Sequence, residues 1–167
     1  LAAAFSVASV NPDRAWEAFD PQAFADLLGK EPMLLDFTAD WCPSCKALEH
    51  TTLNKNRMED LRRKYNVRTI RVDITRNAEA GKELLRALDS TSIPVLALFP
   101  AGSGARQPVV LRDLVTPGQL EEAASATFAG QRLESFRRML SDNGLRLGPS
   151  FMLEGPSCPI FTSPLPR

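Results

Sequence analysis

Apolar positions along the chain switch between short continuous runs and helical repeats, and these switches predict alternating strands and helices. Two runs, 33–38 and 95–99, are nearly all apolar, which is typical of strands covered on both faces of a sheet. Residues 68–75 instead alternate around Ile70 and Val72, as strand residues do. With a short edge strand and the return strand of a hairpin, the predicted strands are 11–19, 33–38, 68–75, 95–99 and 109–111.

Between these strands, apolar residues recur at the spacing of a helix. Asp20 and Pro21 are suited to begin the first helix and Gly29 to end it, while Thr116 and Pro117 begin the last. The predicted helices are 20–29, 42–49, 56–65, 78–88 and a last one from 116 onward. The alternation implies parallel strands followed by an antiparallel hairpin. We therefore expect an α/β fold with a central mixed sheet of four to five strands flanked by helices.

The chain of 167 residues divides into three predicted parts. Residues 1–11 are small and apolar but too few to span a bilayer, so they are the end of a membrane helix, the remnant of an export signal or a disordered terminus. Residues 12–130 form one domain with a sizeable core. Residues 131–167 extend the last helix into a Gly- and Pro-rich tail, to which we assign no function. Because the first residue is Leu1, we expect a processed or excised piece.

Composition narrows the functional classes without selecting one. Apolar residues make up 44% and charged residues 24%, a balance typical of globular proteins. The 20 basic and 20 acidic residues cancel, and no dense basic cluster or acidic run occurs, so we expect no nucleic-acid partner. Three cysteines leave one unpaired: Cys42 and Cys45 form a pair, and Cys158 in the tail is expected to be incidental.

The paired cysteines lie where strand 33–38 gives way to a helix. Free N–H groups and the positive end of the helix dipole stabilise a thiolate at Cys42, and Cys45 faces it one turn later. We expect Cys42 to attack a partner disulfide, Cys45 to resolve the mixed disulfide, and a Cys42–Cys45 disulfide to form. The alternatives are a structural disulfide or half of a zinc site, for which only His50, an expected surface residue, and Cys158 are further soft ligands.

Four segments carry a resemblance to a known family: the run from Asp36 to Lys46, Glu49, residues 72–75 and the pair Ile93-Pro94. Together they resemble the thioredoxin superfamily over residues 12–128. Within it, the chain is most similar to the C-terminal periplasmic thioredoxin-like domains of the DsbD thiol:disulfide interchange proteins. The resemblance implies a thioredoxin-like fold. Pro43-Ser44 differs from the Gly-Pro between the cysteines of thioredoxin, so the reduction potential stays open.

Two carboxylates are candidates for handling protons. Asp36 lies inside an apolar strand, so we expect burial to raise its pKa and to let it exchange protons with Cys45, a role that the resemblance favours. The alternative is a solvated carboxylate at a strand end. Glu49, one turn beyond Cys45, is expected either to tune these pKa values or to lie on a solvated helix face.

Three residues are candidates for binding the partner. The resemblance implies that Pro94 is a cis-proline facing the disulfide, with Ile93 pairing with the extended backbone of the partner. The alternative is a buried trans proline at a strand start. Trp41 is expected to shield the sulfurs and offer an apolar docking surface, to lie in the core, or both.

The leading hypothesis is a protein-disulfide reductase that relays electrons. The chain lacks a flavin or nicotinamide motif such as G-x-G-x-x-G, so we expect the Cys42–Cys45 pair itself to be the redox centre, without a further cofactor. We also expect no metal. The resemblance implies two partners, the transmembrane domain of the same or a partner polypeptide and periplasmic thiol–disulfide proteins. It also implies a periplasmic domain of an inner-membrane protein, monomeric when isolated, with a role in cytochrome c biogenesis. The alternatives are a stand-alone thioredoxin, a disulfide oxidase, or a binding module whose dithiol is structural or binds metal.

Overall fold

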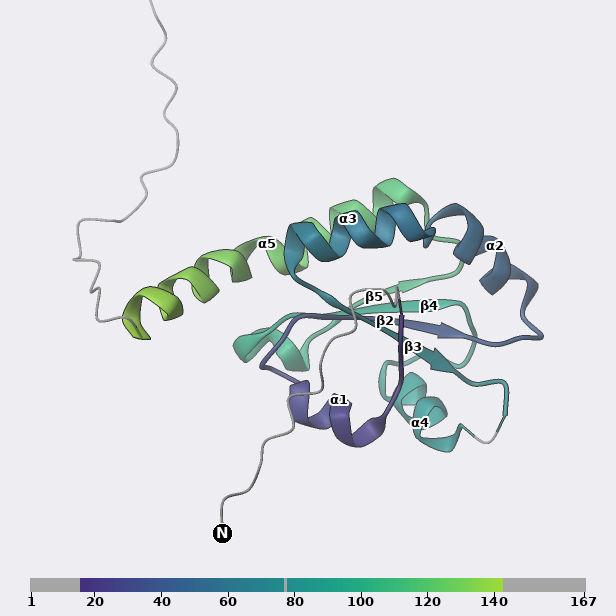
Figure 1. The fold of residues 1–167 in the computed structure, drawn as a ribbon. Helices are drawn as coiled ribbons and strands as arrows, with labels where there is room; N and C mark the ends of the chain where they lie inside the picture. Colours follow the sequence, from purple (N-terminus) through teal and green to yellow (C-terminus); the bar gives the residue numbers. More distant parts are fainter. Residues whose placement is uncertain (1–15, 77, 143–167) are drawn as a thin grey trace, which may run out of the picture. The chain divides into compact units, whose positions relative to one another are not determined.

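A computed structural model describes residues 16–76 and 78–142 of the chain, with side chains described up to residue 130 (Figure 1). The strands are β1 (Glu17–Ala18), β2 (Met33–Thr38), β3 (Arg68–Asp73), β4 (Val95–Phe99) and β5 (Val109–Arg112). The helices are α1 (Pro21–Leu27), α2 (Pro43–Thr51), α3 (Lys55–Tyr65), α4 (Glu79–Ala87) and α5 (Pro117–Asp142), with a short 3-10 helix, η1 (Gly102–Arg106). These elements confirm the predicted order, although β1 is much shorter than the predicted strand 11–19.

The five strands form one mixed sheet in the order β1-β3-β2-β4-β5. Strands β1 and β2 run parallel to β3, whereas β4 runs antiparallel to both β2 and β5. The sheet confirms the predicted α/β class and the antiparallel hairpin at its end. Strand β2 is central, and all six of its residues are buried, because neighbouring strands flank it and helices cover both of its faces.

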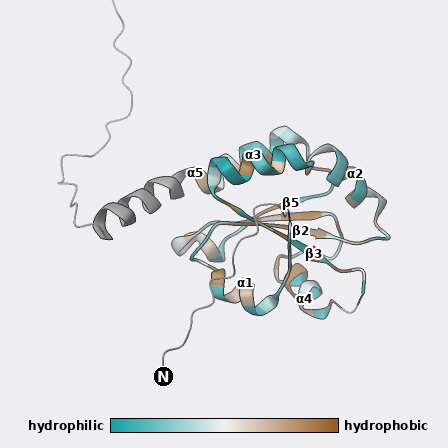
Figure 2. Ribbon diagram, in the orientation of Figure 1, coloured by the Kyte–Doolittle hydropathy of each residue, from teal (hydrophilic) through white to brown (hydrophobic). Residues whose placement is uncertain are grey.

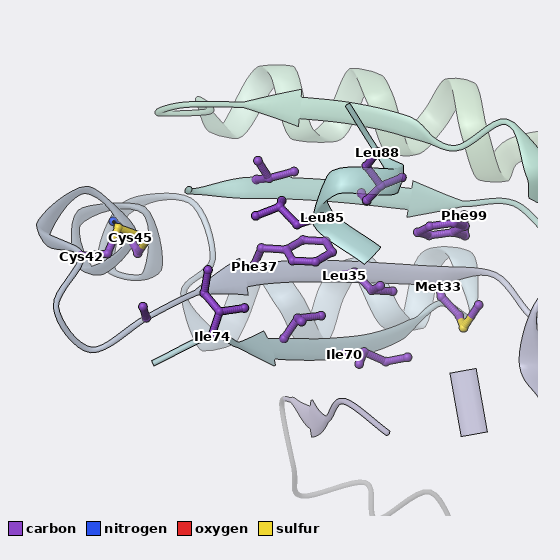
Figure 3. Close-up of a cluster of buried hydrophobic side chains, with 14 residues drawn as sticks. Met33, Leu35, Phe37, Cys42, Cys45, Ile70, Ile74, Leu85, Leu88 and Phe99 are labelled. Atoms are coloured by element: carbon purple, nitrogen blue, oxygen red, sulfur yellow. Dashed lines mark hydrogen bonds between the residues drawn. A yellow bond between two sulfur atoms is a disulfide. The ribbon is translucent and has the colours of Figure 1, made fainter. Parts of the chain in front are cut away.

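Two apolar cores cover the two faces of the sheet. Helices α1 and α4 lie on one face and α2, α3 and the first part of α5 on the other (Figure 1). Met33, Leu35 and Phe37 point to the first face, where they join Leu85 of α4 (Figure 3). Leu34 belongs to the core of the second face, with residues from α2, α3 and α5: Leu48, Met58, Leu61, Leu120 and Ala124. Figure 2 shows apolar residues on the central strands and polar residues along the outside of α3.

The chain divides into two compact units, Leu1–Leu133 and Glu134–Arg167, and every feature discussed below lies in the first. The predicted segment 1–11 and the tail beyond residue 142, including Cys158, lie outside the described residues. The domain limits at residues 12 and 130 therefore stay predictions. Within the described part of the chain, no helix is long and apolar enough to cross a membrane.

Candidate active site

The cysteine pair lies at the start of α2, directly after the central strand β2. Cys42 is the N-cap of α2 and Pro43 is its first residue, a position that suits proline because the first N–H needs no partner within the helix. The backbone N–H of Cys45 donates to Cys42 Sγ at 3.2 Å, and Ser44 Oγ lies 3.4 Å from the same sulfur. A disulfide joins Cys42 and Cys45, whose Cα atoms are 5.3 Å apart (Figure 3). The predicted placement of both sulfurs is therefore confirmed.

The surroundings of the pair favour reactivity at the first sulfur. Both cysteines are buried, and they lie at one end of the apolar cluster that contains Phe37 and Ile74 (Figure 3). The N-terminus of α2 points its free N–H groups and the positive end of its dipole at Cys42. Such an environment lowers the pKa of a thiol, whereas an apolar environment alone raises it.

Asp36 lies in the middle of β2 and is only 1% exposed. Burial raises the pKa of its carboxyl to about 7; the charge of Arg71 opposes this effect and the charge of Glu49 adds to it. The predicted desolvation of Asp36 is thus confirmed, while its proton exchange with Cys45 stays a prediction. A carboxyl with this pKa can both accept and release a proton near neutral pH.

Arg71 of β3 links the two carboxylates. It is the register partner of Asp36 in the parallel pair of β2 and β3, and its Nε lies 3.5 Å from Asp36 Oδ2. Neither of these two buried atoms has a hydrogen-bond partner, so the contact is an ion pair. The Nη2 of Arg71 lies 3.7 Å from Glu49 Oε1, and the ring of Trp16 covers the guanidinium at 5.0 Å. The guanidinium of Arg71 therefore lies near two carboxylates, Asp36 and Glu49.

Glu49 is held within this cluster rather than extended into solvent. Thr38 Oγ1 donates to its Oε1 at 3.2 Å, and Lys46 Nζ lies 3.6 Å from the same oxygen. Its side chain is 20% exposed, so solvent screens these contacts only partly. The structure therefore gives Glu49 a fixed place beside the ion pair of Asp36 and Arg71.

Sequence reasoning missed Arg71 and Thr38. In β3 the residues on either side of Arg71 are the buried Ile70 and Val72, which places Arg71 on the opposite face of the strand. That alternation was visible in the sequence. The pairing of Asp36 with Arg71 was not visible, because it depends on the register between β2 and β3.

The cis-proline segment lies at the edge of the sheet where α2 begins. The Ile93-Pro94 bond is cis, as the resemblance implied. Val95, which follows it, pairs with Phe37 near the end of β2, so Pro94 is at the same edge of the sheet as the start of α2. Pro94 is buried and Ile93 is half-buried.

Two exposed apolar side chains follow strands that end at this same edge. Trp41 is 64% exposed, so the alternative that it lies in the core is wrong, and its side chain is open to a partner, while the shielding of the sulfurs stays a prediction. Leu114 is 59% exposed and was missed, because it lies in a loop that no periodicity describes. The backbone N–H of its neighbour Asp113 donates to Pro94 O at 3.1 Å. His50 is exposed on α2, as expected.

The zinc alternative drew on Cys158, which lies outside the described residues, so it stays open. Among residues 16–76 and 78–142, no three His, Cys, Asp or Glu side chains are placed to hold a metal ion. The described arrangement instead combines a paired dithiol, a buried acid and a cis-proline.

The comparisons with known proteins agree with this geometry. The thioredoxin-like family model matches residues 15–101. The thiol:disulfide interchange protein DsbD of Campylobacter jejuni strain RM1221 is 32% identical over 72 residues, which are 43% of this chain and 12% of that protein. The protein of the same name from Salmonella typhi is 33% identical over 87 residues, 52% of this chain and 15% of that protein.

A solved structure shows the same fold. The thioredoxin from Thermus thermophilus superposes with a TM-score of 0.54 at 14% identity, covering 78% of this chain and 95% of that one. The chain thus matches nearly a whole thioredoxin but only 12–15% of the length of the DsbD proteins. Because the family model covers more than half of its residues, this chain belongs to the thioredoxin-like family.

Proposed function

We propose that this chain is a thiol–disulfide oxidoreductase domain that reduces disulfides in protein partners. The observation that carries the proposal is the pair Cys42 and Cys45 at the N-terminus of α2. A helix N-terminus stabilises the thiolate that disulfide exchange requires. The cis-proline segment gives an extended polypeptide a backbone edge to bind.

The exchange proceeds in two steps. In the reduced protein the Cys42 thiolate attacks one sulfur of the partner disulfide, forms a mixed disulfide and expels the other partner sulfur as a thiolate. Cys45 then loses its proton and attacks Cys42 Sγ, which releases the second partner sulfur and leaves the Cys42–Cys45 disulfide. Two electrons have passed to the partner, and we propose that Asp36 accepts the proton of Cys45.

The similarity to the DsbD proteins extends the proposal to an electron relay. A membrane-embedded dithiol of the same or a partner polypeptide would reduce the pair, which would in turn reduce periplasmic thiol–disulfide proteins, including those of cytochrome c biogenesis. No cofactor is needed in this scheme, because the two sulfurs carry the electrons. The domain would work as a monomer in the periplasm.

Trapping the mixed disulfide tests the proposal. The reduced Cys45→Ser variant is expected to form a covalent adduct with an oxidised protein such as insulin, because the resolving thiol is absent. Wild type should reduce insulin catalytically in the presence of dithiothreitol, and Cys42→Ser should do neither. Cys158→Ser is the matched control and should behave as wild type.

Two results would contradict the proposal. One is an adduct that forms equally well on Cys42→Ser and Cys45→Ser. The other is stoichiometric zinc that is bound by the purified protein and lost in both of these variants, which would favour a metal-binding module.

A further inference from the structure

The loop between α4 and β4 carries the cis-proline, and the structure shows what holds it. Residues 91–93 separate the buried Ser90 from Pro94, and Thr91 and Ser92 are exposed. The chain turns at Asp89, whose φ is 53°. An exposed loop of this kind has many conformations of similar energy unless its ends are fixed.

Arg112, the last residue of β5, fixes one end of this loop. Its Nε donates to Ser90 Oγ at 2.9 Å, and its Nη2 donates to Leu88 O at 2.9 Å and to Asp89 O at 3.4 Å. Ser90 Oγ also donates to Leu88 O at 3.3 Å. The planar guanidinium thus meets three acceptors from three consecutive residues, which a lysine could not match in geometry.

The other end of the loop is fixed by the residue that follows Arg112. The N–H of Asp113 donates to Pro94 O at 3.1 Å, and Arg112 itself pairs with Val95 in the register of β4 and β5. The end of β5 is therefore hydrogen-bonded to the loop on both sides of Ile93. The carbonyls of Leu88 and Asp89 follow the C-terminus of α4, where a positive charge is favourable.

We propose that Arg112 is the positioning residue that holds the cis-proline segment in the conformation that binds an extended polypeptide. The inference rests on the proposed function, because it assumes that a partner backbone pairs beside Ile93. Arg112 acts on docking only, since its side-chain hydrogen bonds within the described part of the chain go to residues 88–90 and not to the sulfurs. A small aromatic disulfide needs no backbone pairing, so its reduction should not depend on Arg112.

The test compares two substrates of the reduced protein. Arg112→Ala is expected to lower kcat/KM for insulin about tenfold, mainly through KM, because charge-assisted hydrogen bonds that hold the loop are lost. The rate with a small disulfide such as dithionitrobenzoate should stay within about twofold of wild type. Arg112→Lys should recover only part of the insulin rate, and Ser90→Ala should lose part of it. Arg86→Ala removes a charge from the exposed end of α4 and should leave both rates unchanged.

A second measurement does not depend on activity. Amide hydrogen exchange of the oxidised Arg112→Ala protein is expected to accelerate in residues 88–94 while β2 and α2 stay protected. The role of Arg112 would be overturned if Arg112→Ala lost the same factor in kcat/KM with insulin and with the small disulfide. It would also be overturned if this variant kept both the amide exchange of residues 88–94 and the insulin rate of wild type. If wild type reduces neither substrate, the proposed function fails, and the exchange data alone then decide whether Arg112 holds the loop.

Discussion

At the scale of single residues, burial and neighbouring charges have opposing effects on the ionisation of Asp36. Asp36 is buried in β2 and shares Arg71 with Glu49. Burial raises the pKa of Asp36 and Arg71 opposes that rise, so the carboxyl exchanges its proton near neutral pH instead of near 4. The burial that raises the pKa of Asp36 also lowers the stability of the fold when Asp36 ionises.

The first prediction concerns the pH dependence of stability. Below pH 3.8 Asp36 is protonated in the folded and the unfolded chain; between 3.8 and about 7 only the unfolded chain loses the proton. The free energy of unfolding should therefore fall as pH rises through this window and level off above about pH 7, at about 1.4 kcal/mol per pH unit at most.

Urea denaturation of the oxidised protein at pH 5 and pH 8 measures this effect. In Asp36→Asn the free energy of unfolding should decrease much less between pH 5 and pH 8. At pH 8 this variant should be more stable than wild type by a few kcal/mol. Asp26→Asn, which changes an exposed aspartate of α1, is the control and should keep the slope of wild type. A wild type whose stability rises from pH 5 to pH 8 relative to Asp36→Asn would contradict the burial argument.

The second prediction concerns Arg71. Arg71→Gln removes the charge that lowers the pKa of Asp36, so the titration midpoint of this carboxyl should move above about 7. Arg71→Lys keeps the charge and should give a smaller shift. The ¹³C chemical shift of the Asp36 carboxyl, followed by NMR against pH in the oxidised protein, measures the titration midpoint in both variants. A midpoint that is unchanged in Arg71→Gln would show that the ion pair has no influence on Asp36.

At the scale of elements, Gly81 lets α4 pack closely on the sheet. Gly81 lies in α4 against the sheet, and a Cβ atom added there would lie 2.8 Å from Val72 Cγ1 and 3.4 Å from Ile74 Cγ2. Val72 is buried and β-branched, so it has few rotamers in which to move away. The absence of a side chain at position 81 therefore lets α4 approach the sheet.

The third prediction compares two helix glycines. Gly81→Ala should destabilise the fold by about 1–3 kcal/mol, because overpacking outweighs the better helix propensity of alanine. Gly118→Ala in the first turn of α5 has no atom within 4 Å of the new Cβ, so it should be neutral or stabilising by up to about 1 kcal/mol. Thermal denaturation of both variants measures the difference, and equal midpoints would argue against the tight contact.

At the scale of the whole molecule, the local signals were visible in the sequence and the long-range contacts were not. The bounds of β2, the helix start at Cys42 and the cis-proline Pro94 follow from apolar runs, helix-start chemistry and the family resemblance, and the structure confirms them. Contacts of Arg71 with Glu49 depend on strand order and register, which no local pattern encodes.

The exposure of single residues was likewise not predictable from local sequence patterns. Trp41 could be expected at the surface or in the core, because the loop between β2 and α2 has no periodicity to decide between them. Arg112 gave no signal either, since its three acceptors lie in a loop more than 20 residues earlier in the chain. The placement of the cysteines at a helix start was therefore predictable, while the contacts of Arg71 and Arg112 required the fold.

The reduction potential of the Cys42–Cys45 pair tests the central claim most directly. The chain would be equilibrated with dithiothreitol and glutathione buffers of known potential, and its free thiols counted after acid quenching. We predict a reversible two-electron transition in the reducing range, nearer to thioredoxin at about −270 mV than to strong oxidases at about −120 mV. No reversible transition, or a midpoint near that of the oxidases, would contradict a domain that passes electrons to partner disulfides.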